Sequence, residues 1–290
     1  MTTADPLRAP AQTAPRQRWH AVALLVAEIL LLAVPFELAY GFAMRLVYRS
    51  DALAGIVFAV LAVLVLFNAY ALWARFVARR APDELSSRRI AGLGGGLILG
   101  AALMCAIVGI LVIGGALHVS AGGGLALAGL PGVALLAGAA EELIARGVLL
   151  RNLENVFGSV AAIVLTAALF GWMHLDNPNA TVLGAAAIGV EAGVMLAAVY
   201  IATRSLWWTI GIHAAWNLTQ TSLFGIADSG HPGGGLLRSE TSGPAWLTGG
   251  IFGVEASLVS VIVCTLVAIG FLWKARRERR FISPIWMRKP

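Results

Sequence analysis

The sequence predicts an all-α membrane protein, a polytopic helical bundle of about eight transmembrane helices. Hydrophobic residues make up 59% of the 290 residues, charged residues only 12%, and the mean hydropathy is +0.83. A soluble domain usually contains about 25% charged residues. Because one spanning helix needs about 20 apolar residues, the chain has room for eight passes joined by short connections.

Eight apolar runs, separated by polar or glycine-rich segments, mark the expected helices. Their approximate bounds are 19–44, 52–73, 90–117, 131–153, 157–174, 180–203, 206–223 and 246–273. Pro131 suits the first turn of the fourth helix, and Pro178 follows the end of the fifth. The glycine-rich stretch 120–130 is expected to be a loop or a short re-entrant piece.

The expected organisation is one membrane domain, residues 19–273, between a polar tail over 1–18 and a basic tail over 274–290. With both termini inside, only Arg45, Arg49 and Arg238 of the 21 basic residues fall on the outer side. This bias predicts a multi-pass protein of the cell membrane with cytoplasmic termini. The net charge of +6 comes from short clusters between apolar runs, so we expect contact with lipid headgroups and no nucleic-acid partner.

Ionisable side chains inside the expected helices point to a functional site, because each costs roughly 2.5–3.5 kcal/mol on insertion scales. Glu142 and Arg146 are four residues apart and share a helix face, whereas Glu141 is turned about 100° away. We therefore expect Glu142 to pair with Arg146 while Glu141 faces a cavity. The plainer alternative is a buried ion pair that only fixes helix packing.

Two further pairs, Phe170 with His174 and His213 with Asn217, also have this four-residue spacing. Together with Glu141 they supply a carboxylate, two imidazoles and a carboxamide, which are suited to activating water and stabilising an oxyanion. The same Glu141, His174 and His213 are also a plausible ligand set for a divalent metal such as zinc, with one open position. Hydrolysis of an acyl bond is the expected reaction class in either case.

Three motifs resemble the CPBP intramembrane proteases, also called Abi or CAAX amino-terminal proteases, which include the type II prenyl-protein endopeptidases. They are Glu-Glu-Leu-Ile-Ala-Arg-Gly at 141–147, Phe-Gly-Trp-Met-His at 170–174 and His-Ala-Ala-Trp-Asn at 213–217. Their order and spacing define an expected protease core over about 130–220. Ala145 and Arg204 depart from the phenylalanine and glycine that the family often has at these positions.

The resemblance implies an intramembrane endopeptidase that acts on a membrane-associated peptide or protein, by a glutamic or a metal-dependent mechanism. Carried onto this chain, it implies that Glu141 and His174 activate water and that His213 with Asn217 stabilises the oxyanion. Arg146 would hold the acidic cluster in place through Glu142. A prenylated substrate is a possibility within the family, although no prenyl-binding groove is evident in the sequence.

Two other functions compete with this interpretation. The first is a non-catalytic immunity or scaffolding protein that uses the polar cluster for helix packing. The second is a transporter in which Glu28, Glu37 and Glu191 relay protons, although hydrogen bonding within the bundle is the preferred explanation of these residues. His118 and His231 are expected in outer loops, without a functional role.

Overall fold

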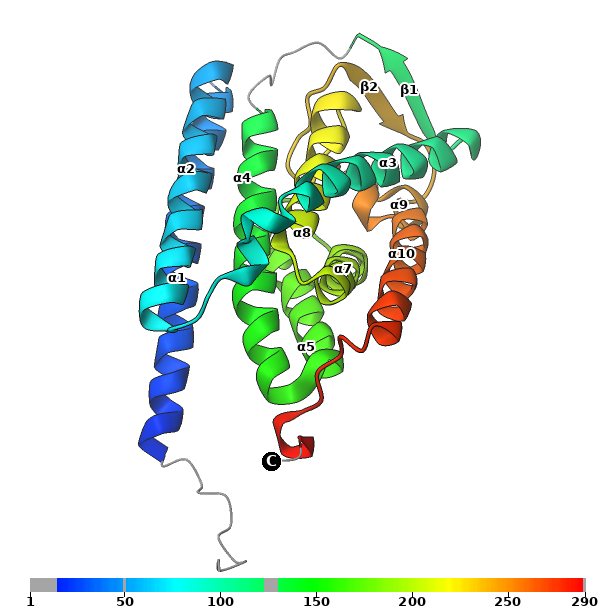
Figure 1. Ribbon diagram of the computed structural model, residues 1–290. Coiled ribbons are helices and arrows are strands. Elements are labelled where there is room, and N and C mark those ends of the chain that lie inside the picture. Colours follow the sequence, from blue (N-terminus) through cyan, green and yellow to red (C-terminus); the bar gives the residue numbers. More distant parts are fainter. Residues whose placement is uncertain (1–14, 49–50, 123–129, 289–290) are drawn as a thin grey trace, which may run out of the picture.

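The computed structural model describes residues 15–48, 51–122 and 130–288, and it confirms the all-α prediction (Figure 1). Residues 1–14 of the expected N-terminal tail, 123–129 of the glycine-rich stretch and 289–290 lie outside the described residues. The α-helices are α1 (Pro15–Tyr48), α2 (Ala52–Leu72), α3 (Ala91–Ile113), α4 (Leu130–Glu142), α5 (Arg151–Met173), α6 (Val182–Ile188), α7 (Met195–Thr203), α8 (Leu206–Leu218), α9 (Ala245–Thr248) and α10 (Leu258–Arg277).

Several α-helices continue into π-helical turns, so that each continuous helical stretch is longer than its α-helix alone. These turns are Trp73–Val77 after α2, Leu143–Leu150 between α4 and α5, Gly189–Val194 between α6 and α7, and Thr219–Leu223 after α8. π-helical turns often occur at functional sites. Here two of them adjoin the motif helices α4 and α8.

Six helical stretches of the described chain are long and apolar enough to cross a membrane, and the protein is an integral multi-pass membrane protein. The longest, Leu130–Asp176, contains both the fourth and the fifth expected helices. They are separated at Gly158, whose φ of 80° and ψ of 167° are not helical. The seventh expected helix is present as α8 and its π-helical turn. Because it contains many polar residues, it is not one of the six stretches that are apolar enough to cross a membrane.

The last long helix begins later than the sequence suggests. We expect a helix over 246–273, but Gly249, Gly250 and Gly253 all have positive φ, which a continuous right-handed helix does not allow. Helix α10 therefore starts only at Leu258, after Ser257, whose side chain accepts a hydrogen bond from the Ser260 amide at 3.1 Å. As a consequence Glu255 lies in the short 3₁₀ turn Val254–Ala256 before α10 rather than in a membrane helix.

A short antiparallel pair of strands connects two loops at one end of the bundle (Figure 1). Strand β1 (Leu117–Ala121) pairs with β2 (Leu237–Thr241), and Leu117 lies opposite Thr241. The third expected helix thus ends at Ile113 instead of 117, and the first residues of the glycine-rich stretch form a strand. His118 is on this strand, exposed to solvent and away from the site.

Close packing of α3 across α8 positions the helix that carries His213 and Asn217 (Figure 1). Gly92, Gly96 and Gly100 follow one another at four-residue spacing on α3. A Cβ atom at Gly96 would clash with the Trp208 carbonyl oxygen, and one at Gly100 would clash with the Ile212 carbonyl oxygen. Small residues thus let the two backbones approach directly.

Replacing Gly100 with leucine is expected to lower the yield of folded protein. The new side chain must displace the backbone of Ile212, the residue before His213, and overpacking of this kind costs about 1–3 kcal/mol or more. Size-exclusion chromatography in detergent measures the monodisperse fraction. Gly109→Leu is the matched control, because nothing lies within 4 Å of a Cβ at that position of the same helix. Equal yields for the two variants would contradict the importance of this crossing.

Candidate active site

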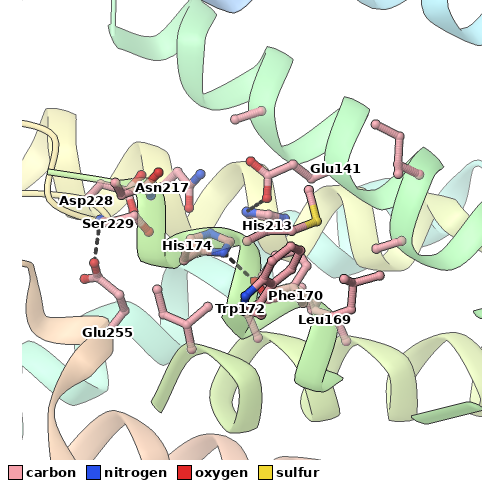
Figure 2. A pocket seen from close by; sticks show the side chains of 18 of the residues that line it. Glu141, Leu169, Phe170, Trp172, His174, His213, Asn217, Asp228, Ser229 and Glu255 are labelled. Atoms are coloured by element: carbon pink, nitrogen blue, oxygen red, sulfur yellow. Dashed lines mark hydrogen bonds and ion pairs between the residues drawn. The ribbon is translucent and has the colours of Figure 1, made fainter. Parts of the chain in front are cut away.

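A cavity of about 740 Å³ lies inside the bundle and is lined by residues of three sequence motifs (Figure 2). Glu141 comes from α4, His174 follows the end of α5, and His213 and Asn217 come from α8. The volume falls in the range of roughly 300–1,000 Å³ that is typical of small-ligand sites. Four of the six candidate residues therefore share one cavity wall.

The other two candidates, Glu142 and Arg146, form a buried ion pair behind this wall. The Arg146 Nη1 atom lies 2.6 Å from the Glu142 Oε1 atom, and the two side chains are 2% and 0% exposed. Arg146 also donates to the carbonyl oxygens of Ala192 at 2.8 Å and Gly193 at 3.2 Å. Its guanidinium carbon is 4.9 Å from the centroid of the Phe170 ring. Arg146 thus connects the motif at 141–147 to the π-helical turn Gly189–Val194 and to Phe170 of α5.

His213 connects this buried pair to the cavity. Its Nδ1 atom lies 3.0 Å from Glu142 Oε1, and its Nε2 atom lies 3.9 Å from Glu141 Oε2. A carboxylate held by an arginine only accepts hydrogen bonds, so Nδ1 of His213 carries the proton in this contact. The opposite nitrogen, Nε2, is then the atom of His213 nearest to Glu141, as Figure 2 shows.

His174 is oriented by the backbone of its own helix. Its Nδ1 atom is 2.7 Å from the Phe170 carbonyl oxygen, which only accepts hydrogen bonds, so Nδ1 must be the donor. In a neutral imidazole, Nε2 is then left as an acceptor. The Phe170 ring lies 4.8 Å from the His174 ring and 6.3 Å from the His213 ring, measured between centroids, and so contacts both imidazoles.

Direct contact between α4 and α8 fixes the distance between the acidic motif and His213. A Cβ atom at Gly138 would lie only 2.7 Å from the Ala214 backbone nitrogen. Asn217 follows one turn later and is 7% exposed. Its backbone oxygen accepts a hydrogen bond from the Thr221 hydroxyl at 2.7 Å, while its side chain lies at the cavity.

Four residues of the cavity wall come from loops near the C-terminus and were not expected from the sequence. They are Asp228, Ser229, His231 and Glu255. Asp228 and His231 exchange two backbone hydrogen bonds of 2.9 Å. The Glu255 carboxylate accepts hydrogen bonds from the Ser229 amide, at 2.5 Å, and from Gln220. His231 lies in a loop, as expected, but this loop folds back onto the cavity, so that His231 lines its wall.

Burial shifts the ionisation of these loop residues. It raises the pKa of Asp228 to about 6, an effect that nearby His213 opposes and Glu141 reinforces. Burial, with a contribution from Asp228, raises the pKa of Glu255 well above its usual range. The pKa of His231 is lowered by burial and by His174. The loop end of the cavity therefore favours neutral forms of its own side chains.

Metal ligation was the second interpretation of Glu141, His174 and His213. Among the residues that the structure describes, no three or more His, Cys, Asp or Glu side chains are grouped closely enough to hold a metal ion. As placed, these three side chains do not form a ligand set.

Comparison with known families supports the resemblance seen in the motifs. Residues 123–219 match the family model described as type II CAAX prenyl endopeptidase Rce1-like. All six candidate residues lie within the matched segment, and the recognition of this protease family is confirmed. No curated protein and no solved structure matches the chain.

Proposed function

We propose that the chain, with its type II CAAX prenyl endopeptidase segment, hydrolyses a peptide bond of a membrane-associated peptide or protein at this cavity. The observation that carries the proposal is the different environment of two adjacent glutamates. Glu142 is fully buried and paired, whereas the Glu141 side chain is 25% exposed and lines the cavity. Helix packing accounts for the first residue but not for the second.

Glu141 and His174 are suited to activating water. Both the Glu141 carboxylate and the Nε2 atom of neutral His174 accept hydrogen bonds, and both residues line the cavity. A water molecule that donates to both keeps a lone pair free for the carbonyl carbon of the substrate. In the proposed first step, Glu141 takes a proton as the new oxygen–carbon bond forms.

His213 and Asn217 are suited to stabilising the resulting oxyanion. The Asn217 carboxamide supplies N–H donors, and a cationic His213 would supply an Nε2–H donor. Glu142 and Glu141 lie on opposite sides of the His213 ring and stabilise a positive charge there. In the second step, the proton held by Glu141 passes to the amide nitrogen and the carbon–nitrogen bond breaks. The products are an amine and a carboxylic acid, which loses its remaining proton to the solvent.

We also propose that both termini face the cytoplasm. Helix α1 begins and α10 ends at the same end of the bundle (Figure 1), and most arginines of the connecting segments are expected on that side.

Whether the cavity holds a metal ion is a separate question. Elemental analysis of active protein, combined with inhibition by chelators, distinguishes a metal-dependent mechanism from one that uses only side chains.

Replacing His174 with alanine is expected to lower the rate of peptide cleavage by about 10²–10⁴-fold, because the water loses one of its two acceptors. The assay uses purified protein in detergent with synthetic single-span peptides, and mass spectrometry identifies the products. His118→Ala is the matched control, since His118 is exposed on β1. Cleavage that survives His174→Ala and His213→Ala alike would overturn the proposed function and would favour the non-catalytic alternative.

A further inference from the structure

Most of the ionisable side chains in the cavity wall are carboxylic acids. The lining includes six carboxylic side chains and, among the described residues, no lysine or arginine. The carboxylic residues are Glu37, Glu141, Asp176, Glu191, Asp228 and Glu255. Glu141 belongs to the proposed reaction, whereas Glu191, Asp228 and Glu255 have no part in it. We call these three residues the acidic end.

Glu191 is the most unusual member of the acidic end, because it is buried without a partner. The residue is only 3% exposed and lines the cavity, yet its carboxyl group makes no hydrogen bond or ion pair with any described residue. Arg146 instead binds the backbone oxygens of the next two residues, Ala192 and Gly193. A carboxyl group this buried needs hydrogen-bond donors in either protonation state, and here they must come from water or a ligand in the cavity.

The other two members lie near Glu191 and come from loops. Both Glu255 and Asp228 are close enough to Glu191 to interact with it electrostatically. Glu255 is held by the Ser229 amide and Gln220, so its position is fixed. No hydrogen bond or ion pair to the Asp228 side chain exists within the described residues. Two of the three carboxyl groups are therefore free to receive donors.

We propose that the acidic end binds a lysine or arginine side chain of the peptide substrate, near the bond that is cleaved. This inference rests on the proposed function. A lysine ammonium or arginine guanidinium offers only donors, and its charge favours the ionised forms of Asp228 and Glu255, which burial disfavours. Among the described residues these three carboxyl groups are not grouped as metal ligands are, whereas a flexible lysine or arginine side chain can reach carboxyl groups that lie apart. A substrate carboxylate would add a buried negative charge beside carboxyl groups that cannot compensate it.

The test compares single-span peptides that differ at one residue. Once a cleaved parent peptide is found, lysine, glutamine or glutamate is placed at each of the three positions on either side of the cleaved bond. At one position the lysine peptide is expected to have a kcat/KM at least about tenfold above the glutamine peptide, with the glutamate peptide lowest. Lysine-to-glutamine ratios within about twofold at every position would overturn the inference.

The protein variants are Asp228→Asn and Glu255→Gln, alone and combined. The combined variant is expected to bring the lysine-to-glutamine ratio close to one, whereas Glu240→Gln is expected to keep the wild-type ratio. Glu240 is the control because it is exposed on β2 and paired with Arg238. Size-exclusion profiles check that each variant is folded. A ratio that is unchanged in the folded combined variant would overturn the inference.

A binding measurement separates this inference from the proposed function. Fluorescent lysine and glutamine peptides are titrated against the His174→Ala variant, with and without Asp228→Asn and Glu255→Gln. If wild-type protein cleaves no peptide, but the lysine peptide binds at least about tenfold more tightly in a manner that needs Asp228 and Glu255, the inference stands and the proposed function fails. If peptides are cleaved and neither cleavage nor binding prefers lysine, the inference fails and the proposed function stands.

Discussion

Replacing Glu141 with glutamine is expected to lower kcat/KM for peptide cleavage by about 10²–10⁴-fold while leaving the fold intact. Glutamine has the same shape but cannot take a proton from water. The Glu141 side chain is 25% exposed, and its nearest charged partner is His213, at 3.9 Å. Removing its charge thus leaves the buried Arg146–Glu142 pair unchanged.

The measurement for Glu141 combines peptide cleavage with thermal unfolding of the same detergent preparation. A melting temperature near that of the wild type, together with lost activity, separates a chemical role from a structural one. Glu240→Gln, which removes an exposed carboxylate on β2, serves as the control. Cleavage by Glu141→Gln within about threefold of the wild-type rate would contradict the role of Glu141 as the base.

Replacing Arg146 with methionine is expected to be the most destabilising single change in the motif helices, by about 3–5 kcal/mol. It leaves the Glu142 charge fully buried without its arginine, and one oxygen of Glu142, Oε2, already has no hydrogen-bond partner among the described residues. It also removes the bonds to the backbone of Ala192 and Gly193. Thermal unfolding in detergent measures the loss.

Two further variants test whether the effect of Arg146→Met comes from breaking the buried ion pair. The double variant Glu142→Gln/Arg146→Met is expected to be more stable than Arg146→Met alone, because the unpaired charge is gone. Arg238→Met is the surface control, since the Arg238–Glu240 pair is 69% and 63% exposed and such pairs contribute about 0–1 kcal/mol. If Arg146→Met and Arg238→Met unfold at the same temperature, the buried pair does not stabilise the fold as we infer.

Local patterns predict those parts of the structure that depend on neighbours in the sequence. Apolar runs locate all eight expected helical segments, because lipid requires long apolar helices. The four-residue spacing predicts the Glu142–Arg146 contact, since residues i and i+4 share a helix face. The same rule places His213 and Asn217 together on one side of α8.

Contacts between distant segments could not be predicted in this way. His213 contacts Glu142 across 71 residues, and only the crossing of α8 with α3 and α4 brings them together. The delayed start of α10 depends on three glycines with positive φ. Their backbone conformation cannot be read from the apolar composition of the segment. Because Glu255 was therefore expected inside a helix, the acidic end of the cavity was not foreseen.

The most direct test of the central claim is cleavage of a single-span peptide in lipid vesicles by the purified 290-residue chain in ¹⁸O-labelled water. We expect a new C-terminus within the apolar segment of the peptide, with ¹⁸O from the solvent in its carboxylate. We expect no such product from Glu141→Gln. Formation of the product at the same rate by Glu141→Gln, or no cleavage across a broad set of peptides, would contradict the claim that this cavity hydrolyses peptide bonds.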